Sequence, residues 1–464
     1  MLYLVCWAAL LLAAIPGLAA EDADPQNPAA IPDPTAGAPA DPERWNLFYQ
    51  ATSIGDMHAG FPAAYSGPLS LANHVEHEVS LTTTLFFGLR LTNSTAFYFN
   101  PEIAGGRGFS GTDGIANAPN GEMPRITTAT PKAYIARAYF QQDFGFGDAT
   151  EAVKSNVNQL AGTRPATRYT IYIGRFSVTD FFDNNRYSHD PRSQFMTWGT
   201  MSNGAWDYPA DTRGYTWGWV HEFHTPHWSV RYASAAEPRV ANGLSFDRRL
   251  FRDRGDIWEG EYDWTVGPHP GAVRLLGFAL HTDSGRYADA LRVAAGTAAT
   301  PDVAAAHIPG TTKYGTGLSI EQELTQDVGV FGRWGWNDGK TESFAFTSID
   351  RLYEGGVSFT GRRWHRDADI AATALTGSGI SGVHRAYLAA GGLDFLIGDG
   401  RLDHYGPEYV WETYYNARLR PGLFVTVDAQ RVANPAYNQD RGPVWIGSLR
   451  VHIEFGKDAF SRKP

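Results

Sequence analysis

The stretch FSVTDFFDNNRYSHDPRSQF, residues 176–195, gathers the groups of this sequence that are best suited to chemistry. Eight of its twenty side chains are Asp, Asn, Arg or His, and aromatic rings lie between them. Carboxylates, amides and guanidiniums form ion pairs and hydrogen bonds, but such a density of charge does not fit a core strand. The composition is also too rich in rings for a linker. We therefore expect an ordered polar loop that binds a ligand or braces the protein.

Two short motifs resemble catalytic or metal sites, but their geometry argues against both functions. The tetrapeptide HEFH contains His221 and His224, which face opposite sides of a strand and so do not share a metal ion. Ser188, His189 and Asp190 are consecutive, and neighbouring residues do not form a proton relay by themselves. We expect no catalytic residues, no metal and no cofactor.

Composition narrows the class of protein. The chain has 464 residues, 50 glycines, 14 Trp, 22 Tyr and 26 Phe, a mixture that favours strands and interfaces. Its net charge of −10 argues against nucleic acid as a partner, because phosphate binding needs a basic face. The single cysteine, Cys6, lies in the N-terminal apolar run, so a disulfide framework is not expected.

The N-terminal region is expected to lie outside the folded domain. Residues 1–20 form a short apolar run that ends in small residues, which is typical of a secretory signal peptide. The alternative is a single membrane anchor, although the run is short for a span of ~20 residues. Residues 21–43 are rich in Pro and Ala and predict a disordered or extended linker.

From Trp45 onward the apolar residues recur with period two. In PVWIGSLRVHIEF, residues 443–455, one face carries Trp445 and Leu449 and the other carries Arg450 and Glu454. Such segments are about ten to fourteen residues long, exceeding the usual strand of ~5–6. Rings lie near the ends of their apolar faces, as expected where a barrel meets the two membrane interfaces. No stretch after residue 20 has eighteen continuous apolar residues, so we expect strands to cross the membrane.

The connections alternate between short and long, as in outer-membrane barrels with short periplasmic turns and long external loops. Counting the segments gives an antiparallel barrel of about sixteen strands over residues 44–455, followed by a tail at 456–464. One connection, 145–165, is long where a short turn is due, and we expect a small helix at 153–160. Ser381 predicts the cap of a second short helix in an external loop, with a small hairpin after it through IGDGRL.

Four long segments carry a resemblance to a known family. They are RFSVTDFFDNNRYSHDPRSQFMTWG, GAWDYPADTRGYTWG, LIGDGRLDHYGPEYVWETYYNARL and NPAYNQDRGPVWIGSLRVHIEF. Together they resemble the carbohydrate-selective porins, the OprB family, over nearly the whole mature chain. The resemblance implies a sixteen-stranded barrel in the bacterial outer membrane, usually a homotrimer, through which mono- or oligosaccharides diffuse passively. The nine residues after Phe455 depart from barrels that stop at that aromatic.

Within this resemblance, residues 178–213 are the third external loop, which in porins folds inward and narrows the pore. Sugars bind weakly to hydroxyl-matching polar groups and stack their C–H faces on rings, which allows entry and exit. The candidate constriction residues are Asp180, Asp183, Asn184, Asn185, Arg186, Asp190, Arg192, Trp198, Trp206, Asp207, Asp211 and Arg213. Alternatively, the pairs Asp190–Arg192 and Asp211–Arg213 pin the loop to the wall, and the aromatics, Phe181, Phe182 and Phe195 above all, pack its own core.

The polar faces of the strands are expected to line the lumen. The candidate lining residues are Arg90, Arg137, Glu222, Arg231, Glu259, Glu261, Asp263, Glu321, Glu323, Arg333, Glu412, Arg418, Asp428, Arg450 and Glu454. This set is mixed and net acidic. It forms either a charge ladder that stiffens the wall or a field that disfavours anions.

Other classes of barrel remain open as alternatives. A general porin would lack sugar selectivity. A channel for acidic polysaccharides should be strongly basic within, a barrel lipase should carry a lipid-facing Ser–His pair, and a structural barrel should be plugged. The lining and the faces of the strands favour the sugar channel over these.

Overall fold

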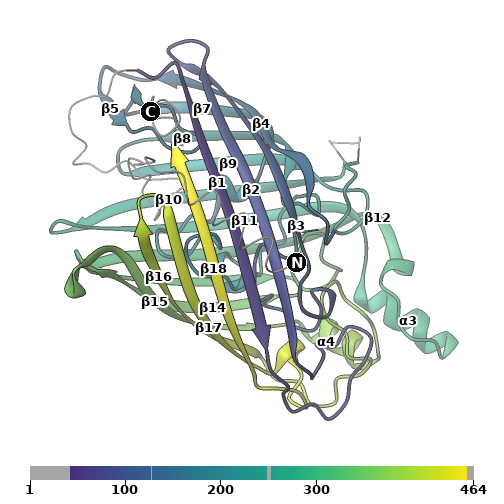
Figure 1. Cartoon of the computed structure of the whole chain (residues 1–464). Coiled ribbons are helices and arrows are strands. Elements are labelled where there is room, and N and C mark those ends of the chain that lie inside the picture. Colours follow the sequence, from purple (N-terminus) through teal and green to yellow (C-terminus); the bar gives the residue numbers. More distant parts are fainter. Residues whose placement is uncertain (1–41, 127, 248–251, 457–464) are drawn as a thin grey trace.

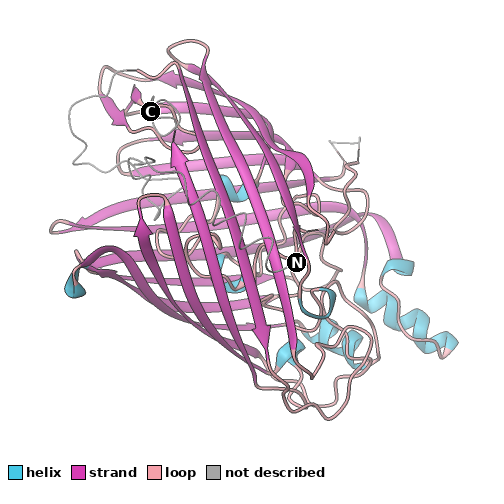
Figure 2. Ribbon diagram, viewed as in Figure 1, coloured by secondary structure: helices cyan, strands magenta, loops and turns pink. Residues whose placement is uncertain are grey.

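A computed structural model describes residues 42–126, 128–247 and 252–456, which form one closed antiparallel β-barrel (Figures 1 and 2). Each strand pairs with the next one around the wall, and β1 closes the circle against β18. The predicted barrel of sixteen strands is confirmed. Its strands are β1 (Trp45–His58), β2 (Glu76–Arg90), β3 (Thr95–Gly106), β4 (Lys132–Gly145), β7 (Arg168–Phe176), β8 (Thr216–His224), β9 (Trp228–Ala236), β10 (Arg254–Val266), β11 (His269–Gly285), β12 (His307–Thr325), β13 (Val328–Asn337), β14 (Arg351–Gly361), β15 (Arg366–Gly379), β16 (Glu408–Arg420), β17 (Leu423–Ala433) and β18 (Val444–Gly456).

Helices are short and lie in the connections. They are α2 (Trp198–Met201), α3 (Tyr287–Thr297), α4 (Gly382–Ala389) and the 3-10 turns η1 (Phe109–Gly111), η2 (Val178–Asp180), η3 (Ala304–Ala306), η4 (Arg362–Trp364) and η5 (Pro435–Tyr437). Within the described part of the chain, no helix has the length and apolar character needed to cross a membrane.

The barrel has a polar interior and an apolar exterior, which is the reverse of a soluble core. On β2, Thr82 and Thr84 are buried in the lumen. On β16, Tyr409 and Trp411 face outward and remain 46% and 41% exposed. This is the arrangement that the period-two pattern predicted, and it places the outer wall against lipid.

Exposed rings gather near the two ends of the outer wall. The end with short turns carries Trp45, Phe144, Trp228 and Tyr262, and the opposite end carries Trp217, Tyr409 and Trp445. Trp and Tyr prefer the boundary between hydrocarbon and water, so these two groups mark the membrane interfaces.

The connections differ in length between the two ends of the barrel. Short turns and the β5 strand lie along the upper left and left of Figure 1, and long loops with α3 and α4 lie toward the lower right. We name the long loops L1 to L8 in chain order: 59–75, 107–131, 177–215, 237–253, 286–306, 338–350, 380–407 and 434–443. In a porin the short-turn end faces the periplasm.

Two of the expected local structures are wrong and one is confirmed. Residues 145–165 form a β-hairpin of β5 (Thr150–Val153) and β6 (Gly162–Pro165) in place of the expected helix. Positive φ angles at Asn158 (53°) and Gly162 (144°) interrupt any helix there. The expected hairpin through IGDGRL is a loop without strands. The helix after Ser381 is present as α4, and the Ser381 hydroxyl accepts a hydrogen bond from the His384 backbone N–H at 3.1 Å.

The signal peptide, most of the linker and the C-terminal tail lie outside the described residues, so these three assignments stay predictions. The linker's last two residues are described, and the Glu43 backbone N–H donates to Ala161 of the hairpin at 3.0 Å.

Candidate functional site

Loop L3 folds into the barrel and crosses the lumen to the far wall. The backbone N–H of Met196 donates to Glu412 on β16 at 2.5 Å. From β18, Arg450 donates to the carbonyl oxygen of Gln194 at 2.7 Å. The loop therefore lies inside the barrel, as the family resemblance implied.

Loop L2 also enters the lumen and lies against L3. The Trp198 N–H donates to the Ala118 carbonyl at 2.9 Å, and the Gly121 N–H donates to the Met196 carbonyl at 2.7 Å. Buried Glu408 on β16 accepts two backbone N–H groups of L2, which fixes that loop to the wall. We call the segments of L2 and L3 that lie inside the barrel, which include residues 116–122 and 192–198, the septum.

Arg192 ties the septum to the opposite side of the barrel. The sequence suggested that it pairs with Asp190, but only its backbone N–H contacts that carboxylate, at 3.0 Å. Its guanidinium pairs with Glu102 on β3 at 3.2 Å and with Glu122 of L2 at 3.3 Å. The bracing role is present with partners other than the adjacent one, because a turn directs neighbouring side chains apart.

Asp211 braces the end of L3 in the same way. It was expected to pair with Arg213, yet its carboxylate pairs with Arg175 on β7 at 2.7 Å. The Arg213 guanidinium lies 4.1 Å from the centre of the Tyr134 ring. The side chains of Asp211 and Arg213 therefore each contact a residue of the barrel wall.

Ion pairs also fix the start of L3. Arg137 on β4 donates two hydrogen bonds to Asp180, at 2.7 and 2.5 Å. Arg333 on β13 bridges Asp183 at 3.0 Å and Glu354 at 2.9 Å. Paired bonds of this kind hold planar groups in a defined orientation.

The carboxylates of β10 face arginines on both neighbouring strands. Arg231 on β9 pairs with Glu259 at 3.1 Å and with Glu261 at 2.5 Å. Arg274 on β11 pairs with Glu261 at 2.9 Å and with Glu321 at 3.2 Å. This arrangement is the charge ladder that the sequence left open as one interpretation.

Several residues expected to line open lumen are covered instead. Arg333, Glu412 and Arg450 are at most 3% exposed because the septum lies on them. Other expected lining residues contact neighbours in the wall or at its ends: Glu323 contacts His269, the Arg418 backbone donates to Asp369, Asp428 contacts Gln430, and Glu454 contacts His452.

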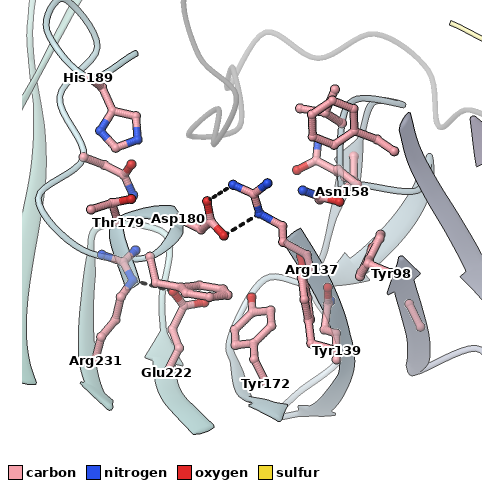
Figure 3. A pocket seen from close by; sticks show the side chains of 18 of the residues that line it. Tyr98, Arg137, Tyr139, Asn158, Tyr172, Thr179, Asp180, His189, Glu222 and Arg231 are labelled. Atoms are coloured by element: carbon pink, nitrogen blue, oxygen red, sulfur yellow. Dashed lines mark hydrogen bonds and ion pairs between the residues drawn. The ribbon is translucent and has the colours of Figure 1, made fainter. Parts of the chain in front are cut away.

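An open cavity of about 290 Å³ remains between the start of L3 and the wall. Figure 3 shows Arg137 and Asp180 linked within it, with Glu222 and Arg231 to one side. Of the candidate residues, those that line it are Asp180, Asn184, Asn185, Arg186, Asp190 and Arg192 from L3 and Arg90, Arg137, Glu222, Arg231, Glu261 and Asp263 from strands.

Aromatic rings form one wall of this cavity. Tyr98, Tyr139 and Tyr172 stand on the neighbouring strands β3, β4 and β7, with ring centres 5.2 and 6.2 Å apart. Phe181 of L3 packs 4.6 Å from Tyr172, so the rings continue from the strands onto the loop. We call these four residues the aromatic wall.

Polar atoms without a protein partner face the same space. They include Asn184 Oδ1, His189 Nδ1 and Asp263 Oδ1. Burial lowers the pKa of His189, which therefore presents a neutral imidazole near pH 7. These atoms are buried beside the cavity, and the protein leaves their hydrogen-bonding capacity unfilled.

The remaining loop candidates do not line the cavity. Trp198 and Trp206 are each 1% exposed and pack against Tyr208, so stacking on a solute is not open to them in this structure. Asp207 pairs with Lys313 at 3.0 Å. The expectation that these two Trp rings contact sugar is therefore corrected in favour of the alternative, packing of the loop's own core.

The charge around the cavity also differs from expectation. Its lining holds nine arginines, at 90, 125, 137, 164, 168, 186, 192, 231 and 274, and seven carboxylates, at 122, 143, 180, 190, 222, 261 and 263. The cavity thus holds two more arginines than carboxylates, with Arg164 and Arg274 among them, whereas the sequence predicted a net acidic lining for the lumen as a whole.

Sequence reasoning missed some of these residues although a signal was available. Tyr139 lies two positions after Arg137 and so shares its face under period two. Arg274 likewise shares a face with the buried residues of β11. The septum partners Glu122 and Arg125 lie in an irregular loop, where no periodicity marks the inward side.

Comparisons with known proteins agree with this architecture. The carbohydrate-selective porin, OprB family, matches residues 70–455. The high-pH structure of Pseudomonas putida OprB is similar at a TM-score of 0.66 and 15% identity, covering 89% of this chain and 94% of that one. Pseudomonas aeruginosa OccK2 (OpdF) is similar at a TM-score of 0.44 and 10% identity, covering 89% and 98%. No curated protein sequence matches the chain.

The family match covers more than half of the chain, and the barrel, its two aromatic bands and its inward third loop agree with it. The chain therefore belongs to the carbohydrate-selective porin, OprB family, whose members are sugar channels of the bacterial outer membrane.

Proposed function

We propose that the cavity beside the start of L3 is the selective constriction through which mono- or oligosaccharides pass. The observation that carries this proposal is that the aromatic wall and polar side chains of L3 line one cavity. A sugar has apolar C–H faces and polar edges, and both kinds of partner are present there. A volume of about 290 Å³ is near the lower end of small-molecule sites, about 300–1,000 Å³. It favours passage of one sugar unit at a time.

The constriction selects neutral solutes, because its charges neutralise one another. Arg137 is held by Asp180, and Arg231 by Glu222 and Glu261. A guanidinium already paired with a carboxylate attracts an anion weakly. The small excess of arginines supports a second candidate, passage of sugar acids, which carry a carboxylate as well as hydroxyls.

The two candidates differ in a liposome swelling assay. We expect proteoliposomes to swell faster in neutral sugars, such as glucose, than in glucuronate of similar size. The sodium salt of the acid is compared at matched osmolarity, with empty liposomes as the control. Faster entry of glucuronate would reject the neutral-sugar proposal in favour of the second candidate.

The chain acts as a channel and not as an enzyme in this proposal, and three copies assemble side by side in the membrane. Membership of the family supports the trimer, and native mass spectrometry in detergent tests it. A single-barrel mass would reject the trimer without affecting the sugar pathway.

A further inference from the structure

The hairpin at 145–165 lies at the short-turn mouth of the barrel, against one arc of its wall. Its strands β5 and β6 pair only with each other, so the barrel itself does not require them. Figure 1 shows β5 at the end of the barrel opposite the long loops. A two-residue turn can join antiparallel strands, so the connection from β4 to β7 does not itself require this length.

Four strands hold the hairpin in place. From β1, the Asn46 amide donates to the Gln159 carbonyl at 2.6 Å. From β2, Arg90 donates to the Ala161 carbonyl at 2.9 Å. Two ion pairs complete the attachment: Arg164 with Asp143 of β4 at 2.8 Å, and Arg168 of β7 with Glu151 at 2.6 Å. These contacts along one arc of the wall, from β1 to β7, fix the position of the turn.

The tip of the hairpin is directed inward. Val157 packs with Phe48 and Phe86 of β1 and β2 in a small buried cluster. Leu160 is 5% exposed and belongs to the same buried cluster as Tyr98. A turn that only joined two strands would have no reason to bury apolar side chains within the lumen.

The tip then shares the cavity with L3. Residues 157–160 line the same space as Asp180 and the aromatic wall. Figure 3 shows Asn158 beside Arg137 at the edge of this space. Asn158 has a left-handed backbone, with φ of 53°, and its buried side-chain oxygen has no hydrogen-bond partner in the protein. An unusual backbone thus places at the cavity an amide whose oxygen the protein leaves without a hydrogen bond.

We infer that the hairpin tip, residues 157–160, forms the periplasmic side of the sugar site. Asn158 is a specificity-determining residue there, and its amide binds a sugar hydroxyl on the side of the cavity opposite Asp180. This inference rests on the proposed function of the cavity. An amide both donates and accepts hydrogen bonds, so it suits a hydroxyl without attracting ions. Asn158 and Asp180 therefore contact the solute from two sides as it moves from the septum to the periplasm.

The test uses the full-length channel in a planar bilayer, with glucose and maltose as probes of current block. Asn158→Gly removes the amide and tolerates the positive φ, and Asn158→Asp keeps the shape but lacks the donor. We expect Asn158→Gly to weaken block by about 2- to 10-fold, as for loss of one hydrogen bond. The change should be greater for sugar added on the short-turn side. Ion conductance should change little.

Lys154→Ala is the matched control, because Lys154 is exposed on the same turn and does not line the cavity. Replacing residues 148–165 by a short Gly–Asn turn should raise conductance and weaken block further. Unchanged block in both the glycine variant and the shortened variant would overturn the inference, while block in the wild type would still support the proposed function. Absence of block in the wild type would overturn both.

Discussion

Single side chains in this lumen hold loops, face the cavity or, like Asp180, do both. Residues of similar type serve the two roles. Asp183 is buried against Arg333, whereas Asp180 lies at the cavity edge with Arg137. Aromatic residues divide in the same way between Trp198, inside the septum, and Phe181, on the aromatic wall. Position, more than residue type, determines the role.

This division predicts opposite results for two ring deletions. Phe181→Ala should weaken sugar block about 2- to 10-fold, since a ring contact is worth ~0.5–1.5 kcal/mol, with ion conductance nearly unchanged. Trp198→Ala should instead loosen the septum, because truncating a buried Trp costs ~3–5 kcal/mol, and should raise current noise. Single-channel recording with glucose titration measures both. If the Trp198 variant weakened block without added noise, its ring would be a sugar contact after all.

At the scale of elements, the barrel wall closes through strand pairing alone and does not need L3. All sixteen barrel strands pair with two neighbours, and no pair depends on L3. The wall residues beneath the loop, such as Glu412 and Arg450, are charged and would meet water if it were absent. The barrel should therefore tolerate loss of the loop.

Deleting residues 183–207 should leave an assembled barrel with higher conductance and weaker sugar block. L2 would lose its partner in the septum, so the pore should widen on both sides of the lumen. Heat-modifiable migration on gels checks assembly, and conductance in a planar bilayer checks the pore. An assembled variant with wild-type conductance would mean that L3 does not limit the flow.

The external loops contain a second ionic element. His384 of α4 lies 3.0 Å from Asp350 of L6 and 3.1 Å from Asp394 of L7, and its ring stacks on Tyr287 of α3 at 4.3 Å. Burial opposes the charged form, but the two carboxylates outweigh it and raise the pKa of His384 from 6.5 to about 9. The charged imidazole therefore holds L5, L6 and L7 together, and we call this cluster of His384, Asp350, Asp394 and Tyr287 the clasp.

The clasp predicts looser external loops at high pH. Because the folded pKa exceeds the unfolded one, the stabilisation is complete below pH 6.5 and is lost as the pH rises through about 9. Its size is on the order of 3 kcal/mol. Limited proteolysis of L5 to L7 should accelerate between pH 7 and 10 in the wild type and be fast at every pH in His384→Gln. Equal, slow cleavage of both proteins at pH 7 would contradict the clasp.

At the scale of the whole molecule, the wall should resist unfolding as one unit. We expect β-rich circular dichroism and faster gel migration before boiling than after it, since a closed barrel leaves no strand edge from which to unravel. A helical spectrum, or identical migration before and after boiling, would contradict the closed barrel.

The wall was predictable because each strand repeats one rule along its length. Period two alone assigns Thr84 to the lumen and Trp411 to lipid. The septum and the hairpin obey no such rule. Asp211 pairs with Arg175 and not with Arg213, and Asn158 lines the cavity from a left-handed backbone that no local pattern marks. Residues of the site come from distant parts of the chain. The local sequence pattern therefore predicted which types of residue form the site, but not which residues pair with each other.

The pairing of β1 with β18 has a consequence for how the molecule is made. Tyr49, near the start of the barrel, lies opposite Phe455, near its end. β1 pairs with β2 on one side, but its other edge stays unpaired until β18, the last strand of the barrel, is in place. During that interval it offers a bare edge to any other chain. The unfolded chain therefore needs a chaperone in the periplasm. Removing β18 should leave an aggregation-prone intermediate and not a smaller channel.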